Sequence, residues 1–558
     1  MSAKKISVEL ADFGKTIEVE GGTSLAEIAA IVGKDSGKEF RPICATVNNK
    51  TEELDFAVYA PKIVRFLDST SDSGSRAYVR SLCMMLYAAV HRLYPGSRLR
   101  IEHSVSNGYY CRFPGLELTP AIIAGIEAEM RRLHKAALPF VRHERPREEV
   151  IELFERQGLD DKVALLRTQD SLYSVYHTLD GLADSYYGCL APDTSHIGVF
   201  ALTPYEDGAL LRGIDRSDPS RTPDIIPQQK MFDAFTRYTA FNNIIGVSNV
   251  GELNRVDIDR HTSELINVAE ALHEKYISRI SDDITRRFEE DGTRVVLIAG
   301  PSSSGKTTFT KRLAVQLRTN LLSPIQISLD NYFVDRTLTP RDESGDYDYE
   351  SIRALDLAQF NSDLRDIIAG REVALPTYSF ETGTRYYRGD TVQLGPRSII
   401  LIEGIHGLNP ELTNTVDQHY KYLIYVSALT TLSIDDHNWV PTTDNRLLRR
   451  IIRDSKYRGT SALETLRRWP SVRRGEEKWI FPYQENADAM FNSSLLFELG
   501  VMKKYGDEVL AAVPNTAPEY AQAYRLRKFL SYFKPIPSEM IPPTSLLREF
   551  LGGSSFHY

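Results

Sequence analysis

The residues best suited to chemistry form one short run, residues 300–308, which reads Gly-Pro-Ser-Ser-Ser-Gly-Lys-Thr-Thr. An apolar segment, 294–299, precedes it, and a helical pattern follows it. Glycines let the backbone curl so that successive N–H groups face one anion, and the positive end of the following helix favours the same anion. This pattern predicts a phosphate cradle in which Lys306 reaches the outer phosphates and Thr307 holds Mg²⁺. The residues expected to contact ATP or GTP are Gly300, Pro301, Ser302, Ser303, Ser304, Gly305, Lys306, Thr307 and Thr308.

Two acidic residues come directly after predicted strands. Asp330 follows the strand candidate 325–329, and Glu403 follows 399–402. Ligands of parallel sheets lie beyond the carboxyl ends of the strands, so both carboxylates should face the cradle. Phosphoryl transfer to a hydroxyl needs a proton acceptor and a carboxylate near the metal. Each residue alone could equally cap a helix or a turn, but beside the cradle we favour catalysis or metal binding.

An arginine-rich helix is predicted over residues 444–454 and is followed by Arg458. It carries positive charge on more than one face, through Arg446, Arg449, Arg450 and Arg453. Such a helix could be solvated, with local Asp–Arg pairs of little energetic weight. We favour a lid whose guanidinium groups neutralise the charge of the phosphates.

The elements that position these residues predict a multidomain α/β protein. From Thr293 onward, strand candidates (295–299, 325–329, 399–402 and 423–426) alternate with helical stretches, which predicts a mostly parallel sheet covered on both faces. A helical connector is expected over 228–292, and the tail 518–558 is expected to contain a helix, a proline-rich stretch and a short final helix. The predicted domains are 1–68, 69–227, 228–292, 293–517 and 518–558.

The first two units look different from the third. Residues 1–68 alternate apolar and polar positions and predict a small mixed α/β unit, and the polar run 69–75 predicts a flexible linker. A helix over 77–94 should then open the second unit.

Composition narrows the class of protein. The 558 residues carry a formal net charge of −8, which argues against a dominant nucleic-acid footprint. The apolar runs are shorter than the ~20 residues that span a bilayer, and the first residues lack the apolar core of a signal peptide. The four cysteines are far apart in the sequence and are expected to be reduced thiols. These features predict a cytoplasmic protein without a membrane partner, and they leave homo-oligomerisation open.

The C-terminal motifs together resemble the uridine kinase/phosphoribulokinase family, over residues 293–492. The motifs that carry the resemblance are 300–308, 330–332, 347–356, 376–385, 403–404 and the arginine helix. The resemblance implies that Asp330 deprotonates the acceptor hydroxyl, that Glu403 and Thr307 hold Mg²⁺, and that the donor is ATP. It also implies a role for Arg450, Arg453 and Arg458 at the lid and substrate, and a nucleoside pocket lined by Tyr349, Glu350, Tyr378, Phe380 and Arg385.

Three positions depart from this family's pattern. Gly383 replaces a base-reading His, Arg468 replaces a Gln, and Glu350 is one methylene longer than the usual Asp. By the resemblance, uridine or cytidine is the expected acceptor, and the three departures leave the base of the acceptor open. Two alternatives remain: a nucleotide-responsive RNA-binding regulator, and a kinase for another small alcohol such as a sugar phosphate or pantothenate.

The N-terminal half resembles threonyl-tRNA synthetase. Residues 1–68 are similar to its TGS domain, a β-grasp fold, and residues 78–203 to its α+β second additional domain, which hydrolyses mischarged tRNA. The positions of that editing site are occupied here by Arg80, Met84, Tyr186 and Leu190. Met and Leu cannot supply imidazole or thiolate chemistry, so we predict no hydrolytic activity and leave RNA contact open. The three-part arrangement, with the tail motif 546–553, resembles bacterial nucleoside kinases that carry a TGS domain.

Overall fold

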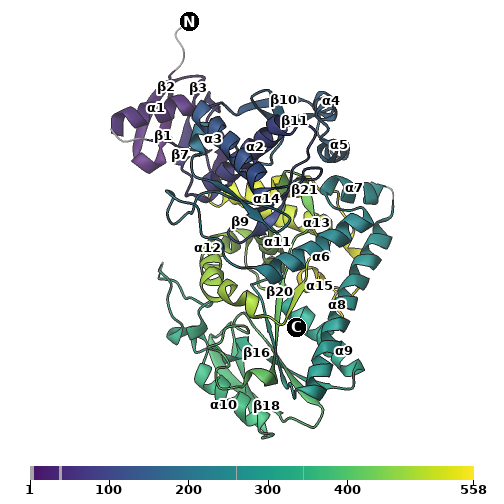
Figure 1. Cartoon of the computed structure of the whole chain (residues 1–558). Helices are drawn as coiled ribbons and strands as arrows, with labels where there is room; N and C mark the ends of the chain where they lie inside the picture. The colour runs from purple at the N-terminus through teal and green to yellow at the C-terminus, as the bar shows by residue number, and fades with distance from the viewer. Residues whose placement is uncertain (1–4, 37–39, 259, 344, 558) are drawn as a thin grey trace.

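The computed structural model describes residues 5–36, 40–258, 260–343 and 345–557. Figure 1 shows the N-terminal units at one end of the molecule and the C-terminal parallel sheet at the other. The tail helix α14 (Tyr520–Ser531) lies between them. No helix in the described part of the chain combines the length and apolar character that a membrane crossing requires.

The first unit is a mixed sheet with one helix on it. Its five strands lie in the order β2-β1-β7-β4-β5, and β1 and β7 are parallel. Alternation explains the strands, because Ile6, Val8 and Leu10 of β1 point into the core. The elements are β1 (Lys5–Leu10), β2 (Lys15–Glu20), β3 (Thr23–Ser24), α1 (Leu25–Ser36), β4 (Cys44–Val47), β5 (Lys50–Glu52), β6 (Ala57–Val58) and β7 (Lys62–Leu67).

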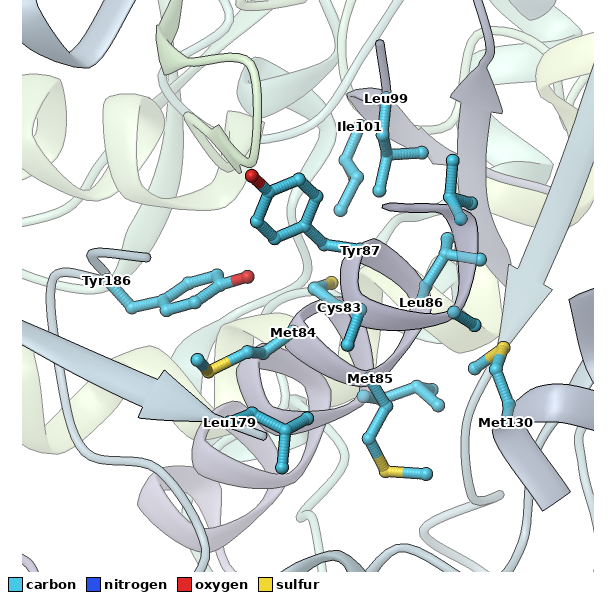
Figure 2. Packing of buried hydrophobic residues seen from close by; sticks show 14 of the residues in the cluster. Cys83, Met84, Met85, Leu86, Tyr87, Leu99, Ile101, Met130, Leu179 and Tyr186 are labelled. Atoms are coloured by element: carbon cyan, nitrogen blue, oxygen red, sulfur yellow. The ribbon is translucent and has the colours of Figure 1, made fainter. Parts of the chain in front are cut away.

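The second unit surrounds one long buried helix, α2 (Asp72–Leu93). Figure 2 shows side chains from this helix, such as Met84 and Leu86, packed among residues of the surrounding strands and helices. The other elements are β8 (Arg100–Val105), β9 (Gly108–Arg112), α3 (Pro120–Ala136), β10 (Val141–Pro146), α4 (Arg147–Gln157), α5 (Asp160–Arg167), β11 (Tyr173–Leu179), β12 (Leu182–Asp184), β13 (Ala201–Tyr205) and β14 (Gly208–Arg212).

The prediction of a flexible linker over 69–75 was wrong. Helix α2 already begins at Asp72, and Ser71 caps it by accepting a hydrogen bond from the Gly74 N–H. A Cβ at Gly74 would lie 1.8 Å from the carbonyl oxygen of Asp68. The small polar residues here serve a helix cap and a close backbone contact, which the composition of the run does not distinguish from a linker.

The segment predicted as a helical connector is helical in the structure. It consists of α6 (Gln229–Ile245), α7 (Val250–Ile258) and α8 (Thr262–Glu290). The apolar face of α8 packs with the helix that follows the phosphate cradle, in one core that contains Ile277, Ile284 and Phe309.

The third unit is built on a five-stranded parallel sheet in the order β16-β19-β15-β20-β23. Alternate residues of the central strand β15 enter two different cores, with Leu297 on one face and Ile298 on the other. A sheet covered on both faces explains the continuous apolar run. The elements are β15 (Val295–Ala299), α9 (Lys306–Thr319), β16 (Ser323–Ser328), α10 (Leu357–Ile368), β17 (Val373–Ser379), β18 (Thr384–Val392), β19 (Ser398–Glu403), β20 (Lys421–Ser427), β21 (Ser433–Asp435), β22 (Asn438–Trp439), α11 (Thr442–Tyr457), α12 (Ala462–Trp479), β23 (Ala489–Asn492), α13 (Glu498–Ala511), and in the tail α14 and α15 (Arg548–Leu551).

A buried charge network joins the second unit to the third. Lys162 of α5 lies 2.9 Å from Asp184 Oδ1 and 2.9 Å from Asp435 Oδ1, across the β21–β22 hairpin. His437 Nδ1 in that hairpin lies 2.8 Å from Asp184 Oδ2. Burial alone would lower the pKa of Lys162, but its attraction to Asp184 and Asp435 outweighs burial and raises it. The hairpin therefore ties the two units together through charges that water does not reach.

Candidate active site

The phosphate cradle has the backbone that its glycines predict. Gly300 has φ +157°, and a Cβ there would lie 1.9 Å from the carbonyl oxygen of Val426. Gly305 has φ +84° and precedes the first residue of α9. The cradle thus lies at the carboxyl end of the central strand β15, with the amino end of α9 above it.

Lys306, Thr307 and Glu403 meet at this end of the sheet. Lys306 Nζ donates a hydrogen bond of 3.1 Å to the Pro301 carbonyl, and Thr307 Oγ1 donates one of 3.4 Å to Glu403 Oε1. Burial raises the pKa of Glu403 to about 7, although Lys306 partly offsets this. Burial lowers the pKa of Lys306, against the attraction of Glu403 and Asp330. Burial therefore favours the neutral forms of Lys306 and Glu403. A bound anion would favour the charged form of Lys306, and a bound cation would favour the charged form of Glu403.

The donor set suits magnesium. Mg²⁺ prefers oxygen ligands and often takes only one or two carboxylates from the protein. Thr307 and Glu403 present a hydroxyl and a carboxylate to the same spot. In the described ranges, no three His, Cys, Asp or Glu side chains gather as a separate metal site.

Asp330 stands at the end of β16, two strands from the cradle. It belongs to the 3-10 turn Leu329–Tyr332, and its N–H donates to Ser328 Oγ at 3.4 Å. The residue is solvent-exposed, yet the protein displaces part of the water around its carboxyl group, and this desolvation raises the pKa of Asp330. The positive charges of Lys306, Arg458 and Arg453 act in the opposite direction. A solvent-exposed carboxylate with a raised pKa can accept a proton from a bound hydroxyl.

Four aromatic rings cluster beyond Asp330. Tyr378 and Phe380 lie 5.1 Å apart, and Phe333 lies 5.5 Å from Tyr378 and 6.0 Å from Tyr349. Such rings offer an apolar surface for a flat base to stack on. Phe333 was not among the predicted site residues, although its spacing of three residues from Asp330 could have pointed to it.

Two polar residues beside the rings carry buried atoms without a partner. Glu350 Oε2 and Arg385 Nη1 have no hydrogen-bond partner among the described residues. The Arg385 Nη2 atom donates to Asp356 Oδ2 at 2.9 Å. Burial, together with the nearby Glu476 carboxylate, raises the pKa of Glu350 to about 7. Buried polar atoms left without partners are expected where a polar ligand supplies the missing bonds.

Arg336 explains the unusual glycine at 383. A Cβ at Gly383 would lie 2.7 Å from Arg336 Nε, so the arginine occupies the space of a side chain at that position. The Arg336 N–H also donates to the Gly383 carbonyl at 2.8 Å. Arg336 was not among the predicted site residues, because its contact with residue 383 arises only in the fold.

The arginines of α11 divide into two groups. Arg446 and Arg449 are buried in ion pairs with Glu476 and Glu498, and Arg446 Nε also donates to the Ser302 carbonyl at 3.0 Å. These two residues hold the cradle in place. Arg450 Nη1 donates to Ser302 Oγ at 2.9 Å, on the open side of the same loop.

The remaining two arginines of the predicted lid pair locally. Arg453 Nε donates to Asp454 Oδ1 at 2.9 Å, and Arg458 Nε lies 3.7 Å from the same oxygen. Arg458 is more than half exposed, which leaves it free to move toward a ligand. Local Asp–Arg pairing and a contact with the cradle loop thus both occur among the predicted lid arginines.

The four positions of the second unit that the resemblance aligns with an editing site have structural contacts here. Arg80 donates two hydrogen bonds, of 3.0 and 2.9 Å, to the Cys189 carbonyl. Met84, Tyr186 and Leu190 are buried in the core around α2, and Figure 2 shows Met84 and Tyr186 in the same packed cluster. The four cysteines are all free thiols. These positions form a packed core instead of a pocket with catalytic side chains.

Comparison with known proteins agrees with both halves of this description. Residues 295–495 match the model of the phosphoribulokinase/uridine kinase family. The C-terminal half contains a domain of that family. A uridine kinase of Staphylococcus epidermidis is 29% identical over 197 residues, which cover 35% of this chain and 86% of that enzyme. The structure of a possible uridine kinase from Bacillus stearothermophilus is 23% identical and covers 36% of this chain and 89% of its own, with a TM-score of 0.25.

The N-terminal half matches a different class of protein. A threonine–tRNA ligase of Syntrophomonas wolfei is 30% identical over 215 residues, which cover 38% of this chain and 33% of the ligase. The chain thus spans about a third of the length of the ligases that it matches. The predicted combination of a kinase-family domain with synthetase-like domains in one α/β chain is confirmed, while the domain boundaries and the roles of the site residues stay predictions.

Proposed function

We propose that this chain is a kinase that transfers the terminal phosphoryl group of ATP, or of GTP, to the 5′-hydroxyl of a nucleoside, with uridine and cytidine the first choices. The observation that carries the proposal is the arrangement at one edge of the sheet. A phosphate cradle, the lysine of that cradle and a carboxylate with a raised pKa lie at the ends of β15 and β16, and Lys306 and Asp330 influence each other's charge.

The roles of the chain's residues follow from this arrangement. The cradle N–H groups and Lys306 bind and orient the phosphates, while Arg450, Arg453 and Arg458 approach from α11 and exclude water. Asp330 accepts the proton of the acceptor hydroxyl as that oxygen bonds to the terminal phosphorus and the nucleoside diphosphate leaves. Mg²⁺, which Thr307 and Glu403 would hold, neutralises charge on the phosphate oxygens when it is bound.

The acceptor is assigned from the aromatic cluster. Tyr349, Tyr378 and Phe380 suit a stacked base better than a sugar phosphate or pantothenate. Glu350 and Arg385 offer the unpartnered polar atoms that ribose hydroxyls or base carbonyls could satisfy. Arg336 at Gly383 supports an acceptor with carbonyl oxygens at its far edge, since a guanidinium only donates hydrogen bonds.

A direct transfer assay tests this proposal. Purified full-length protein is incubated with labelled ATP or GTP, Mg²⁺ and a panel of nucleosides, extended to sugar phosphates and pantothenate. We expect a labelled nucleoside monophosphate. The Asp330→Asn variant should bind ATP as the wild type does and lose about 10²–10⁴-fold in turnover, the usual contribution of a general base. Turnover close to wild type in that variant would refute the role of Asp330.

A second candidate function has one observation in its favour, the similarity of the N-terminal half to threonine–tRNA ligases. In that case the chain would be a nucleotide-responsive regulator that binds RNA. Retention of tRNA by the purified protein, without transfer to any acceptor of the panel, would favour this alternative over the kinase.

A further inference from the structure

The tail places a carboxylate on the phosphate cradle. We call residues 545–553, which include α15, the tail clip. Glu549 Oε2 accepts a hydrogen bond of 2.7 Å from Thr308 Oγ1 and one of 3.3 Å from the Thr308 N–H. Next to it, Leu546 lies so close to the cradle that a Cβ at Gly305 would be 2.1 Å from its Cδ2 atom. Two side chains of the clip thus contact the turn between the glycine loop and α9.

Glu549 binds the Thr308 N–H, a helix-start group of the kind that also binds nucleotide phosphates. Helix α9 begins at Lys306, and the first N–H groups of any helix have no acceptor inside the helix. The first N–H group of α9 that bonds to a carbonyl one turn earlier is that of Phe309, which donates to the Gly305 carbonyl at 3.0 Å. Thr308 N–H is therefore among the donors that face outward at the positive end of α9, where a phosphate is stabilised for the same reason as a carboxylate.

The clip is firmly held where it lies. Leu546 is fully buried in the core that contains Phe309 and Leu313, and Phe550 is fully buried in the neighbouring core. The guanidinium of Arg449 lies 5.0 Å above the Phe550 ring, and the Lys456 ammonium contacts the Leu551 carbonyl. Because Arg449 and Lys456 belong to the arginine-rich helix α11, the clip connects the start of α9 to that helix.

A second carboxylate of the chain lies at the other end of the cradle. Glu476 of α12 accepts a hydrogen bond of 3.3 Å from the Ser302 N–H and pairs with Arg446. The cradle is an anion site, and in this arrangement the chain's own acidic side chains bind two of its N–H groups.

We propose that Glu549 is an intramolecular competitor of the nucleotide: its carboxylate occupies the anion position at the start of α9 until the phosphates of an incoming nucleotide displace it. Only the side chain has to leave, because the buried residues Leu546 and Phe550 keep the clip in place. The proposal rests on the proposed function only in taking ATP, ADP or the guanine equivalents as the ligand of the cradle.

Direct binding to the full-length protein tests this inference. Isothermal titration with ADP and ATP is carried out on the wild type, Glu549→Gln and Glu549→Asp. The amide of Gln removes the charge, and the shorter Asp keeps the charge but cannot reach Thr308 from the same backbone position. Both variants should therefore bind nucleotide more tightly, by about five- to tenfold for the Gln variant, which corresponds to the replacement of a charge-assisted hydrogen bond by a neutral one.

The matched control is Glu539→Gln, an exposed carboxylate of the same tail, which should leave nucleotide binding unchanged. Unchanged or weaker binding in Glu549→Gln would overturn the proposal, since Glu549 would then be a helix cap or part of the nucleotide site itself. If the Gln variant fails to fold, the Asp variant carries the same test, and unchanged affinity there would equally overturn it. The titrations contain no acceptor, so a failed nucleoside panel with normal nucleotide binding refutes the proposed acceptor and leaves this inference standing.

Discussion

Replacing Lys162 by Met should loosen the junction between the second and third units. The lysine is 1% exposed and is the shared partner of Asp184 and Asp435, which are themselves 0% and 3% exposed as side chains. Met has similar length and fills the space but supplies no charge. The variant leaves two carboxylates in a region that water does not reach, with His437 as the remaining nearby cation when it is protonated.

The size of the effect follows from the burial of the network. Removing one partner of a buried ion pair costs about 3–5 kcal/mol, because the other partner stays desolvated. For a cooperative unit of 150–250 residues, each kcal/mol lowers the unfolding midpoint by about 2–4 °C. We therefore expect the midpoint of the second unit to fall by about 6–20 °C at neutral pH. The loss should shrink on acidification, since protonation of Asp184 and Asp435 removes the unpaired charges.

Thermal unfolding followed by calorimetry provides the measurement. Lys135→Met, the same substitution at an exposed position of α3, is the control and should change the midpoint little. A triple variant that also carries Asp184→Asn and Asp435→Asn should recover part of the loss, because no unpaired charge is left. A Lys162→Met midpoint within about 2 °C of the control would refute the reasoning, since the network would then contribute no more than a surface pair.

Three further predictions concern the active site. Glu350→Gln should raise the unfolding midpoint more at pH 8 than at pH 5. The pKa of Glu350 is raised from 4.5 to about 7 in the folded protein, so ionising this buried carboxyl group destabilises the fold increasingly between about pH 4.5 and 7. The full destabilisation, which Gln removes, is therefore present only above that range. Equal gains at both pH values would contradict this assignment. Gly300→Ala should weaken nucleotide binding by at least about tenfold, because its Cβ would collide with the Val426 carbonyl. Gly125→Ala in α3, where a Cβ meets nothing within 4 Å, should bind nucleotide normally in the same titration. Arg336→Ala should raise the KM for the acceptor with little change in the KM for ATP, and steady-state kinetics in which both constants stay at wild-type values would remove Arg336 from the acceptor site.

The parts of the fold that could be predicted are those that local sequence patterns specify. Apolar runs predicted the strands β15, β16, β19 and β20, and the strand–glycine loop–helix order predicted the cradle. Strand β23 was missed because its four residues carry no alternation that distinguishes them from a loop. The start of α2 was misplaced because Ser and Gly serve both linkers and caps.

The parts that could not be predicted depend on contacts between distant residues. Arg446 and Arg449 look like Arg450 in the sequence, but their partners Glu476 and Glu498 are 30 and 49 residues away and bury them. Glu549 contacts Thr308 across 241 positions of the chain, so no local pattern marks it. The types of the site residues could be read from their motifs, whereas the division between residues that hold the cradle and residues that face a ligand required the fold.

The position of the tail clip also has a consequence for biosynthesis. Leu546 is the last residue of one hydrophobic core, and Leu547, Phe550 and Leu551 are the last residues of another, and every other member of the two cores comes earlier in the chain. A growing polypeptide folds from its first residues onward, so the kinase-family domain emerges from the ribosome with both cores open until residue 551 has followed. A message that stops before codon 545 therefore yields a protein with exposed apolar surface beside its glycine loop, which quality-control proteases can recognise.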